Sequence, residues 1–157
     1  MSREIKYQAW DKEEKRMSKV LLIDWINECV DLDEGVIERD FNQVELLEYI
    51  GRKDEDECEI YEEDIVQVIE QGHNMGFYYE NEYVGIVKYD EEYCSFKLKL
   101  IKFVRGGELI PDEVDGIPIS FEDEDEITDY WFSEWIVAED MKILGNTFEN
   151  PELLKGE

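Results

Sequence analysis

The fold is decided by residues 77–100, Phe-Tyr-Tyr-Glu-Asn-Glu-Tyr-Val-Gly-Ile-Val-Lys-Tyr-Asp-Glu-Glu-Tyr-Cys-Ser-Phe-Lys-Leu-Lys-Leu. Two polar triplets, residues 80–82 and 90–92, interrupt the apolar runs, and they have the length of hairpin connections. Over residues 96–100 apolar side chains alternate with lysines, which is the period of a strand with one inward face. The stretch therefore predicts an antiparallel meander.

Strand patterns also occur on either side of this meander. Residues 5–10 alternate on a period of two, with Ile, Tyr and Ala on one side. Residues 64–69 are rich in β-branched side chains, and residues 141–148 close the series. The apolar run over residues 20–26 fits either a strand or a short buried helix, and we prefer a strand.

These patterns predict a mainly β fold (α+β with little helix), built as a small twisted, barrel-like antiparallel sheet that follows an N-terminal strand region. We expect one domain over residues 1–157, divisible into an N-terminal β lobe over residues 1–45 and a barrel-like β lobe over residues 46–157. Glycines, prolines and a dense acidic run mark residues 105–128 as a surface excursion.

The C-terminal part of the chain carries two further signals. Asn150 is a good helix cap and Pro151 suits a first helical position, so a short terminal helical turn is expected there. Residues 127–137 have aromatic side chains near helical spacing, yet the same residues equally suit a strand. That segment stays open between the two structures.

Charge restricts the partners that the chain can bind. The sequence has 43 acidic and 16 basic residues, and its formal net charge is −27. Nucleic acids and anionic membranes bind through Lys and Arg that neutralise phosphate, so direct binding to either is disfavoured. The acidic residues then either form a solvated surface or imitate DNA toward a basic partner.

Length and cysteine content point to a reduced intracellular protein. A chain of 157 residues with 43% hydrophobic content can build a core without disulfides or a structural metal. Cys29, Cys58 and Cys94 are an odd, widely spaced set with no CxxC pair, so no zinc site is predicted. The sequence has no long apolar stretch or secretion signal, so we expect a cytoplasmic location.

No residue pattern indicates catalysis. His73 is the only histidine and reads as a turn residue. The acidic run over residues 122–126 lacks the spaced positions of a calcium loop, so neither a metal site nor a cofactor is predicted. The aromatic segment near residue 130 is the first candidate for a protein interface, because exposed Trp and Tyr anchor interfaces. Its candidate residues are Tyr130, Trp131, Phe132 and Trp135.

Three ordered blocks carry a family resemblance. They are residues 3–12 (Arg-Glu-Ile-Lys-Tyr-Gln-Ala-Trp-Asp-Lys), residues 59–66 (Glu-Ile-Tyr-Glu-Glu-Asp-Ile-Val) and residues 144–154 (Leu-Gly-Asn-Thr-Phe-Glu-Asn-Pro-Glu-Leu-Leu). Together they resemble the YopX family of small phage and prophage proteins. The resemblance implies a mainly β structure and a phage or prophage setting in bacteria, and it assigns no catalytic residue.

The matched positions are apolar, turn-forming or capping residue types, so we expect structural roles for them. The chain departs from the family pattern at Glu57 and Glu63, where the family usually has glycine. Both changes remove a residue that tolerates φ > 0, which predicts a loop that is built differently here.

Three hypotheses for function follow. The first is a noncatalytic phage or prophage accessory protein that acts through protein contacts with an unidentified partner. The second is an acidic DNA mimic that sequesters a basic nucleic-acid-binding protein. The third is a carboxylate- or metal-dependent enzyme, which nothing in the sequence favours. A homo-oligomer is compatible with the composition if it buries apolar surface and keeps like charges apart.

Overall fold

A computed structural model describes residues 4–74, 77–92, 94–105, 117–120, 136–137 and 141–154. The described residues form a mainly β protein with short 3-10 turns, as the sequence predicts. The chain divides into two compact units, Met1–Gly51 and Arg52–Glu157. Each unit is described by itself below.

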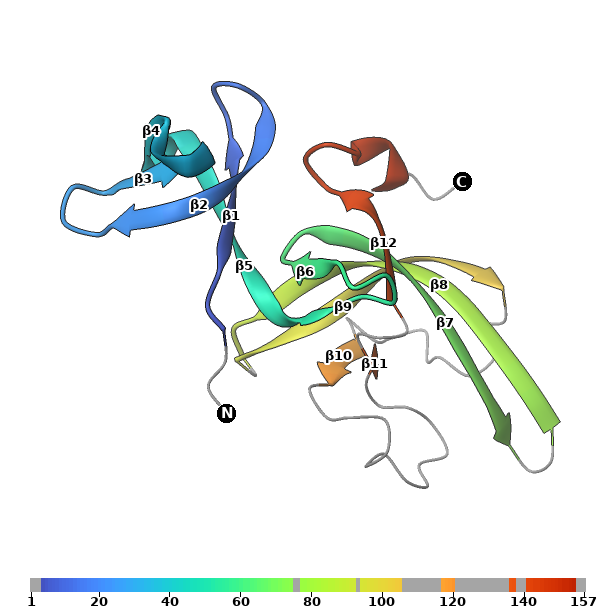
Figure 1. Ribbon diagram of the computed structural model, residues 1–157. Coiled ribbons are helices and arrows are strands. Elements are labelled where there is room, and N and C mark those ends of the chain that lie inside the picture. The colour runs from blue at the N-terminus through green and yellow to red at the C-terminus, as the bar shows by residue number, and fades with distance from the viewer. Residues whose placement is uncertain are drawn as a thin grey trace. The chain divides into compact units, whose positions relative to one another are not determined.

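The strands at the N-terminus belong to a sheet with the order β4-β3-β2-β1-β5-β6 (Figure 1). The elements of the first unit are β1 (Tyr7–Asp11), β2 (Arg16–Asp24), β3 (Cys29–Leu32), η1 (Asp33–Gly35), β4 (Ile37–Asp40), η2 (Phe41–Gln43) and β5 (Val44–Lys53), which ends just beyond Gly51. β6 (Glu59–Tyr61) belongs to the second unit. β1 pairs antiparallel with both β2 and β5, so it lies in the interior of the sheet. Ile5, which the alternation placed in the first strand, precedes β1 and is exposed.

The core of the first unit forms on one face of these strands. Fully or almost fully buried side chains from β1, β3 and β5 make up its centre, with partly buried neighbours from β2, β4 and η2 packed against them. The central residues are Ala9, Val30, Leu32 and Val44. Burial of such side chains stabilises the fold by about 1.5–3 kcal/mol each for the larger ones.

The apolar run over residues 20–26 forms a strand, but the strand does not extend to its end. β2 stops at Asp24, and Trp25 and Ile26 lie in the turn that leads to β3. A register shift between Val20 and Leu22 marks a bulge in the β2–β3 pair.

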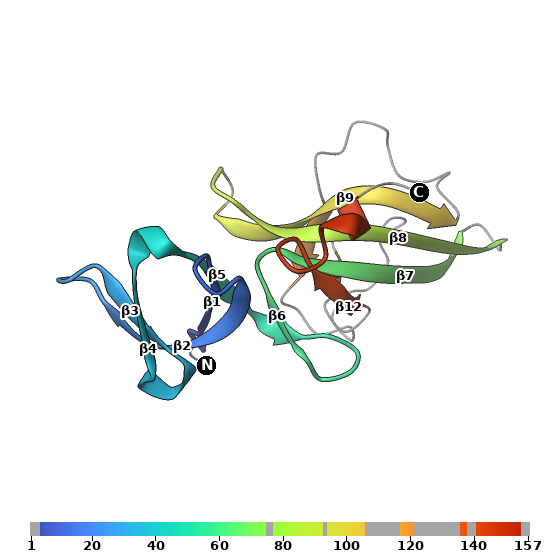
Figure 2. The same cartoon turned by 90° about the horizontal axis from the view of Figure 1, so that it is seen from above.

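The second unit is built on long antiparallel strands. The strand order is β11-β10-β9-β8-β7-β12, and Figure 2 shows β7, β8 and β9 side by side. The elements are β7 (Asp64–Asn74), β8 (Phe77–Asp90), β9 (Ser95–Arg105), β10 (Ile117–Ser120), β11 (Ile136–Val137), β12 (Met141–Asn146) and η5 (Pro151–Leu154). β7, β8 and β9 form an antiparallel meander, and β10 and β11 pair in parallel. Residues 90–92 lie at the β8–β9 connection as predicted, but the predicted connection at residues 80–82 is wrong, because these residues continue β8 and pair with β7.

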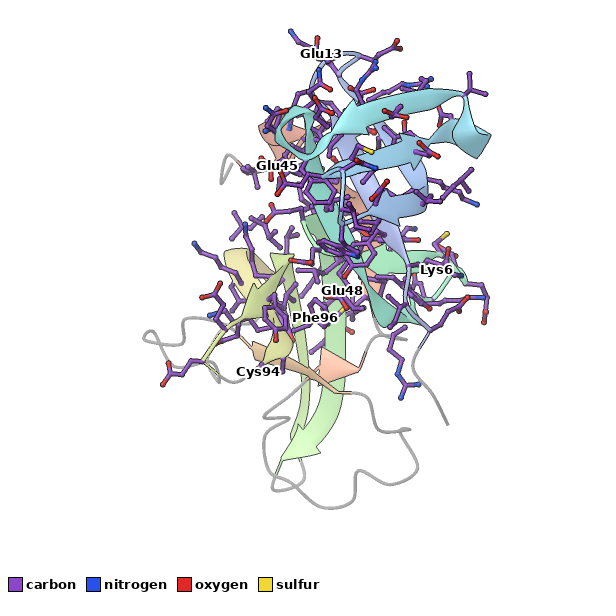
Figure 3. All side chains as sticks on the ribbon, turned by 90° about the vertical axis from the view of Figure 1, so that its left-hand side faces the viewer. Lys6, Glu13, Glu45, Glu48, Cys94 and Phe96 are labelled. Carbon is purple, nitrogen blue, oxygen red and sulfur yellow. The ribbon has the colours of Figure 1, made fainter. Side chains whose placement is uncertain are left out.

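Close packing between β8 and β9 explains why a glycine occupies position 85. A Cβ at Gly85 would lie 2.8 Å from the carbonyl oxygen of Lys99, and it would also meet the side chain of Leu98. Phe96 and Leu98 are buried as the alternation predicts, and Figure 3 shows Phe96 beside Cys94 at the start of β9. Tyr89 packs edge-on against Phe96, with ring centroids 5.4 Å apart.

Several predictions can be compared with these elements. Over the described residues both sheets are open, so the strands form no closed barrel. The terminal helical turn is present as η5, a 3-10 turn that begins at Pro151. His73 lies within β7 opposite Tyr78 rather than in a turn. Most of the excursion over residues 105–128 lies outside the described residues.

Candidate functional site

The predicted aromatic interface cannot be placed. Tyr130, Trp131, Phe132 and Trp135 all lie outside the described residues, as does the acidic run over residues 122–126. The structure does describe the blocks that resemble the YopX family. It also shows two exposed apolar side chains elsewhere in the chain, those of Trp25 and Ile26.

The middle block and the closing block meet where β7 pairs with β12, with Gly145 opposite Ile65 and Asn146 opposite Asp64. The loop before β6 also contacts β12. The carboxylate of Asp54 accepts hydrogen bonds from the backbone N–H groups of Asp56, Cys58 and Ile143, at 2.9, 2.8 and 3.2 Å. The Glu55 N–H also donates to the Met141 carbonyl at 3.0 Å. Asp54 and Glu55 therefore cover backbone groups of β12 that would otherwise be exposed at the edge of the sheet.

The closing block folds back on itself through two asparagines. The side-chain oxygen of Asn146 accepts from the N–H groups of Phe148 and Glu149, and that of Asn150 accepts from the Asn146 N–H at 3.3 Å. A Cβ at Gly145 would lie 2.7 Å from Cγ of Asn150. The side chain of Asn150 thus holds the turn after β12, and its backbone carbonyl accepts a hydrogen bond from the Leu153 N–H at 3.1 Å at the start of η5. These contacts give Asn146 and Asn150 structural roles.

Glu63 connects the same region to β8. Its carboxylate forms an ion pair with Lys88 and accepts a hydrogen bond from the Thr147 hydroxyl at 2.7 Å. Its φ is +68°, and that of Glu57 is +63°. Both residues therefore adopt the left-handed conformation that glycine favours, and the expected rebuilding of the loop is not seen at these two positions.

Asp64 is, like Asp54, a buried carboxyl group of this region. The pKa of the Asp64 carboxyl group is raised to about 7, mainly by burial and also by the charges of Asp54 and Glu149. The hydrogen bond from the Tyr61 N–H lowers the pKa, but by less than burial raises it. The Tyr61 N–H donates to Asp64 at 2.9 Å. A raised carboxyl pKa suits a general acid, but here the carboxyl group serves as an acceptor for a turn.

The other chemistry-bearing side chains that the structure describes include carboxylates and thiols. Within the described ranges, no group of three or more His, Cys, Asp or Glu residues could hold a metal ion. Burial, followed by nearby carboxylates, raises the pKa of Cys29, and Asp54 is the main cause that raises the pKa of Cys58. Both thiols are therefore held in the protonated form, which is a poor nucleophile.

The β2–β3 turn exposes large apolar side chains in a fixed conformation. Trp25 is 70% exposed and Ile26 is 91% exposed. The Asp24 carboxylate accepts hydrogen bonds from the N–H groups of Ile26 and Asn27, each at 3.0 Å, and from the Asn27 side chain at 2.7 Å. We call residues 24–28 the hairpin tip, and Figure 1 shows this turn at the end of the β2–β3 pair.

Phe41 and the turn η2 lie against the hairpin tip and hold it in place. The Phe41 N–H donates to the Glu28 carbonyl at 2.9 Å, and the Trp25 and Phe41 rings meet edge-on at 5.5 Å. An Asp40–Gln43 capping box fixes η2, the turn that supplies Phe41. Trp25 is therefore an exposed aromatic side chain that Phe41 and η2 already hold in position. Such side chains are typical of the residues that dominate protein interfaces.

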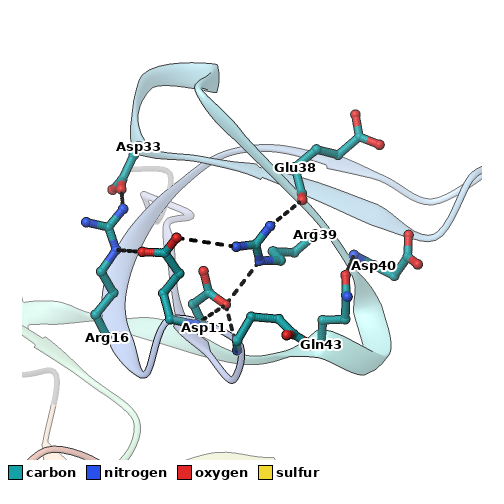
Figure 4. Close-up of polar contacts among 9 residues, drawn as sticks. Asp11, Arg16, Asp33, Glu38, Arg39, Asp40 and Gln43 are labelled. Atoms are coloured by element: carbon teal, nitrogen blue, oxygen red, sulfur yellow. Dashed lines mark hydrogen bonds and ion pairs between the residues drawn. The ribbon is translucent and has the colours of Figure 1, made fainter.

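A buried ion pair stiffens the same sheet. Arg39 Nε lies 3.1 Å from Asp11 Oδ1, and Arg39 also donates to the Glu38 carbonyl, as Figure 4 shows. Burial raises the pKa of Asp11, but hydrogen bonds from Arg39, Glu14 and Glu13 outweigh it and lower the pKa overall. Asp11 ends β1 and is completely buried.

Comparisons with known proteins place the chain in a family. A family model described as YopX protein matches residues 6–155. The chain belongs to the YopX family. The comparison with curated proteins gives no match.

One solved structure is similar to this YopX chain over nearly its whole length. It is the crystal structure of protein EF1440 from Enterococcus faecalis, which covers 98% of this chain and 100% of its own, with 21% sequence identity and a TM-score of 0.56. At this identity the similarity supports the fold alone. In the part of the chain that the structure describes, no helix is long and apolar enough to cross a membrane.

Sequence reasoning did not identify the hairpin tip. Trp25 and Ile26 end an apolar run whose earlier residues, Val20 and Ile23, pack against the core. The signal that could have found the tip is Asp24, because an aspartate within an apolar run can end a strand by accepting hydrogen bonds from the next backbone N–H groups.

Proposed function

We propose that this YopX protein is a noncatalytic phage or prophage accessory protein that acts by binding another protein through the hairpin tip. The observation that carries the proposal is the exposure of Trp25 and Ile26 on a turn whose backbone is already fixed. A fixed turn loses little conformational freedom on binding, so more of the contact energy is available for affinity.

Energetic considerations support the choice of these residues. Burial of a large apolar side chain contributes about 1.5–3 kcal/mol, and tryptophan is enriched among the few residues that dominate interfaces. Leu21 and Leu22, 55% and 51% exposed, lie on the strand that leads to the hairpin tip, so further apolar side chains are exposed on β2.

The test compares proteins retained from bacterial host lysate by the tagged wild type, by a Trp25→Ser/Ile26→Ser double variant and by a Val36→Ser control. Val36 is 82% exposed but follows η1, at the opposite end of β3. All three substituted side chains are exposed, so each variant should melt close to the wild type.

We expect a protein that the wild type and the Val36→Ser control retain and the double variant loses, and that duplex DNA does not displace. Equal retention by all three proteins would contradict a role for the hairpin tip. Displacement by DNA from every variant would instead favour the acidic DNA mimic.

A further inference from the structure

The strands beside the hairpin tip place acidic side chains on one outward face. Asp24, Cys29 and Asp40 are partners across β2, β3 and β4, and the row two residues away contains Leu22, Asp31 and Glu38. Residues two apart on a strand share a face, so these two rows lie on the same side of the sheet. We call Asp24, Asp31, Glu38 and Asp40 the acidic face.

The intervening row lies on the opposite side. Val30 and Ile23 belong to the core cluster, and Arg39 turns to Asp11 and Glu14. Residues 20–41 contain seven acidic side chains and one basic side chain, which is Arg39. The one basic side chain of this segment therefore forms its ion pairs on the core side of the sheet. The two rows that contain the acidic face include no basic side chain.

Electrostatics at Cys29 agrees with this geometry. After burial, the causes that raise the pKa of its thiol are the charges of Glu38, Asp24, Asp31 and Asp40. These are the four members of the acidic face, so their carboxylates act together on one small area.

The acidic face destabilises the sheet when no partner is bound. Asp31 and Glu38 are direct cross-strand partners, and like charges opposite one another destabilise a sheet. A partner with positive charge would remove this repulsion on binding, whereas a second copy of the chain, a nucleic acid or an anionic membrane would add to it.

We infer that the hairpin tip inserts into an apolar pocket of a protein whose rim carries Lys or Arg side chains that face the acidic face. The inference rests on the proposed function, because it names the chemistry of the partner that the hairpin tip binds. Trp25 and Ile26 supply the apolar contact, and Asp31 and Glu38 supply charge that accelerates association and selects a basic rim.

The experiment uses the protein that the wild type retains and the Trp25→Ser/Ile26→Ser variant loses, purified and titrated at low and physiological salt. The charge variant is Asp31→Asn/Glu38→Gln, and the control is Glu13→Gln. Glu13 is an exposed carboxylate in the β1–β2 turn, away from the acidic face.

The wild type and the control should bind at least about tenfold more weakly at physiological than at low salt, since charge pairs at an interface rim are screened. The charge variant should bind several-fold more weakly at low salt and depend less on salt. Because it removes a like-charge pair, it should also be at least as stable as the wild type, which separates lost binding from unfolding.

A partner whose affinity depends on Trp25 and Ile26 but not on salt or on the charge variant would overturn this inference and leave the proposed function standing. If no retained protein depends on the hairpin tip, the proposed function fails and the inference fails with it.

Discussion

Glu57 and Glu63 have the same backbone conformation but different side-chain surroundings. Glu57 is exposed, whereas the Glu63 carboxylate contacts Lys88 and Thr147. A left-handed conformation costs a residue with a Cβ about 1–2 kcal/mol, and glycine does not bear this cost. A substitution by glycine therefore removes this cost in the folded state. Glycine also gives the unfolded chain more conformational freedom, and this offsets part of the stability that the substitution gains.

We therefore predict that Glu57→Gly raises the free energy of unfolding by up to about 1 kcal/mol. Glu63→Gly is the matched comparison, and it should be less stable than Glu57→Gly because it loses the ion pair and the hydrogen bond. Denaturant unfolding of both variants measures the difference. Equal effects would show that the side-chain contacts of Glu63 contribute nothing.

Asp64 predicts a pH dependence of stability. Its pKa is about 7 in the folded protein against 3.8 for an unperturbed group. Between these values the folded state holds a proton that the unfolded state has released, so the free energy of unfolding falls as pH rises, by about 1.4 kcal/mol per unit. The contribution is complete below the unfolded pKa and is lost above the folded pKa.

Asp64→Asn isolates this contribution from the other carboxylates. Its side-chain oxygen can still accept from the Tyr61 N–H, and it carries no charge at any pH. The variant should be more stable than the wild type at about pH 8, with the difference shrinking toward about pH 5. A constant difference across this range, measured by urea unfolding, would mean that Asp64 is ionised throughout.

Sequence patterns could predict many of the strands, but they could not predict which residues far apart in the chain come into contact. Asp11 is buried because Arg39, 28 positions away, reaches it across the sheet, and no local pattern records that pairing. Trp25 is exposed because Asp24 redirects the chain, although Val20 and Ile23 of the same apolar run are half-buried in β2.

At the scale of elements, β12 and the turn after it depend on one close approach. Gly145 has no room for a Cβ because the Asn150 side chain lies against it. Gly145→Ala should lower the free energy of unfolding by about 1–3 kcal/mol, the usual cost of overpacking.

The same substitution in an Asn150→Ala background should cost much less, because the side chain that it meets is gone. Thermal unfolding of the two single variants and the double variant gives the coupling between the sites. Additive effects would mean that the two residues do not meet as described.

Local polar composition predicted one of the two connections in the meander. The polar triplet over residues 90–92 lies at the β8–β9 connection as expected, whereas the triplet over residues 80–82 continues β8 because its backbone pairs with β7. The limits of β2 were missed, because a strand ends where its hydrogen bonds end and the residue pattern of residues 20–26 continues beyond that point. The candidate interface near residue 130 stays a prediction.

At the scale of the whole molecule, acidic charge should limit stability. The net charge of −27 creates repulsion among carboxylates that the folded state brings closer together. We predict that the melting temperature rises as sodium chloride is added and then levels off, as the Debye length falls from about 30 Å at 0.01 M to about 3 Å at 1 M. A flat or falling response would show that self-repulsion does not limit stability.

The central claim is that the hairpin tip meets a partner protein inside the cell, and photo-crosslinking tests it most directly. A photoreactive amino acid is placed at position 26, or at position 36 as the control, in bacteria that express the protein. Mass spectrometry then identifies what is linked. The proposal predicts one protein linked from position 26 and absent from position 36. The same products from both positions, or none from position 26, would contradict it.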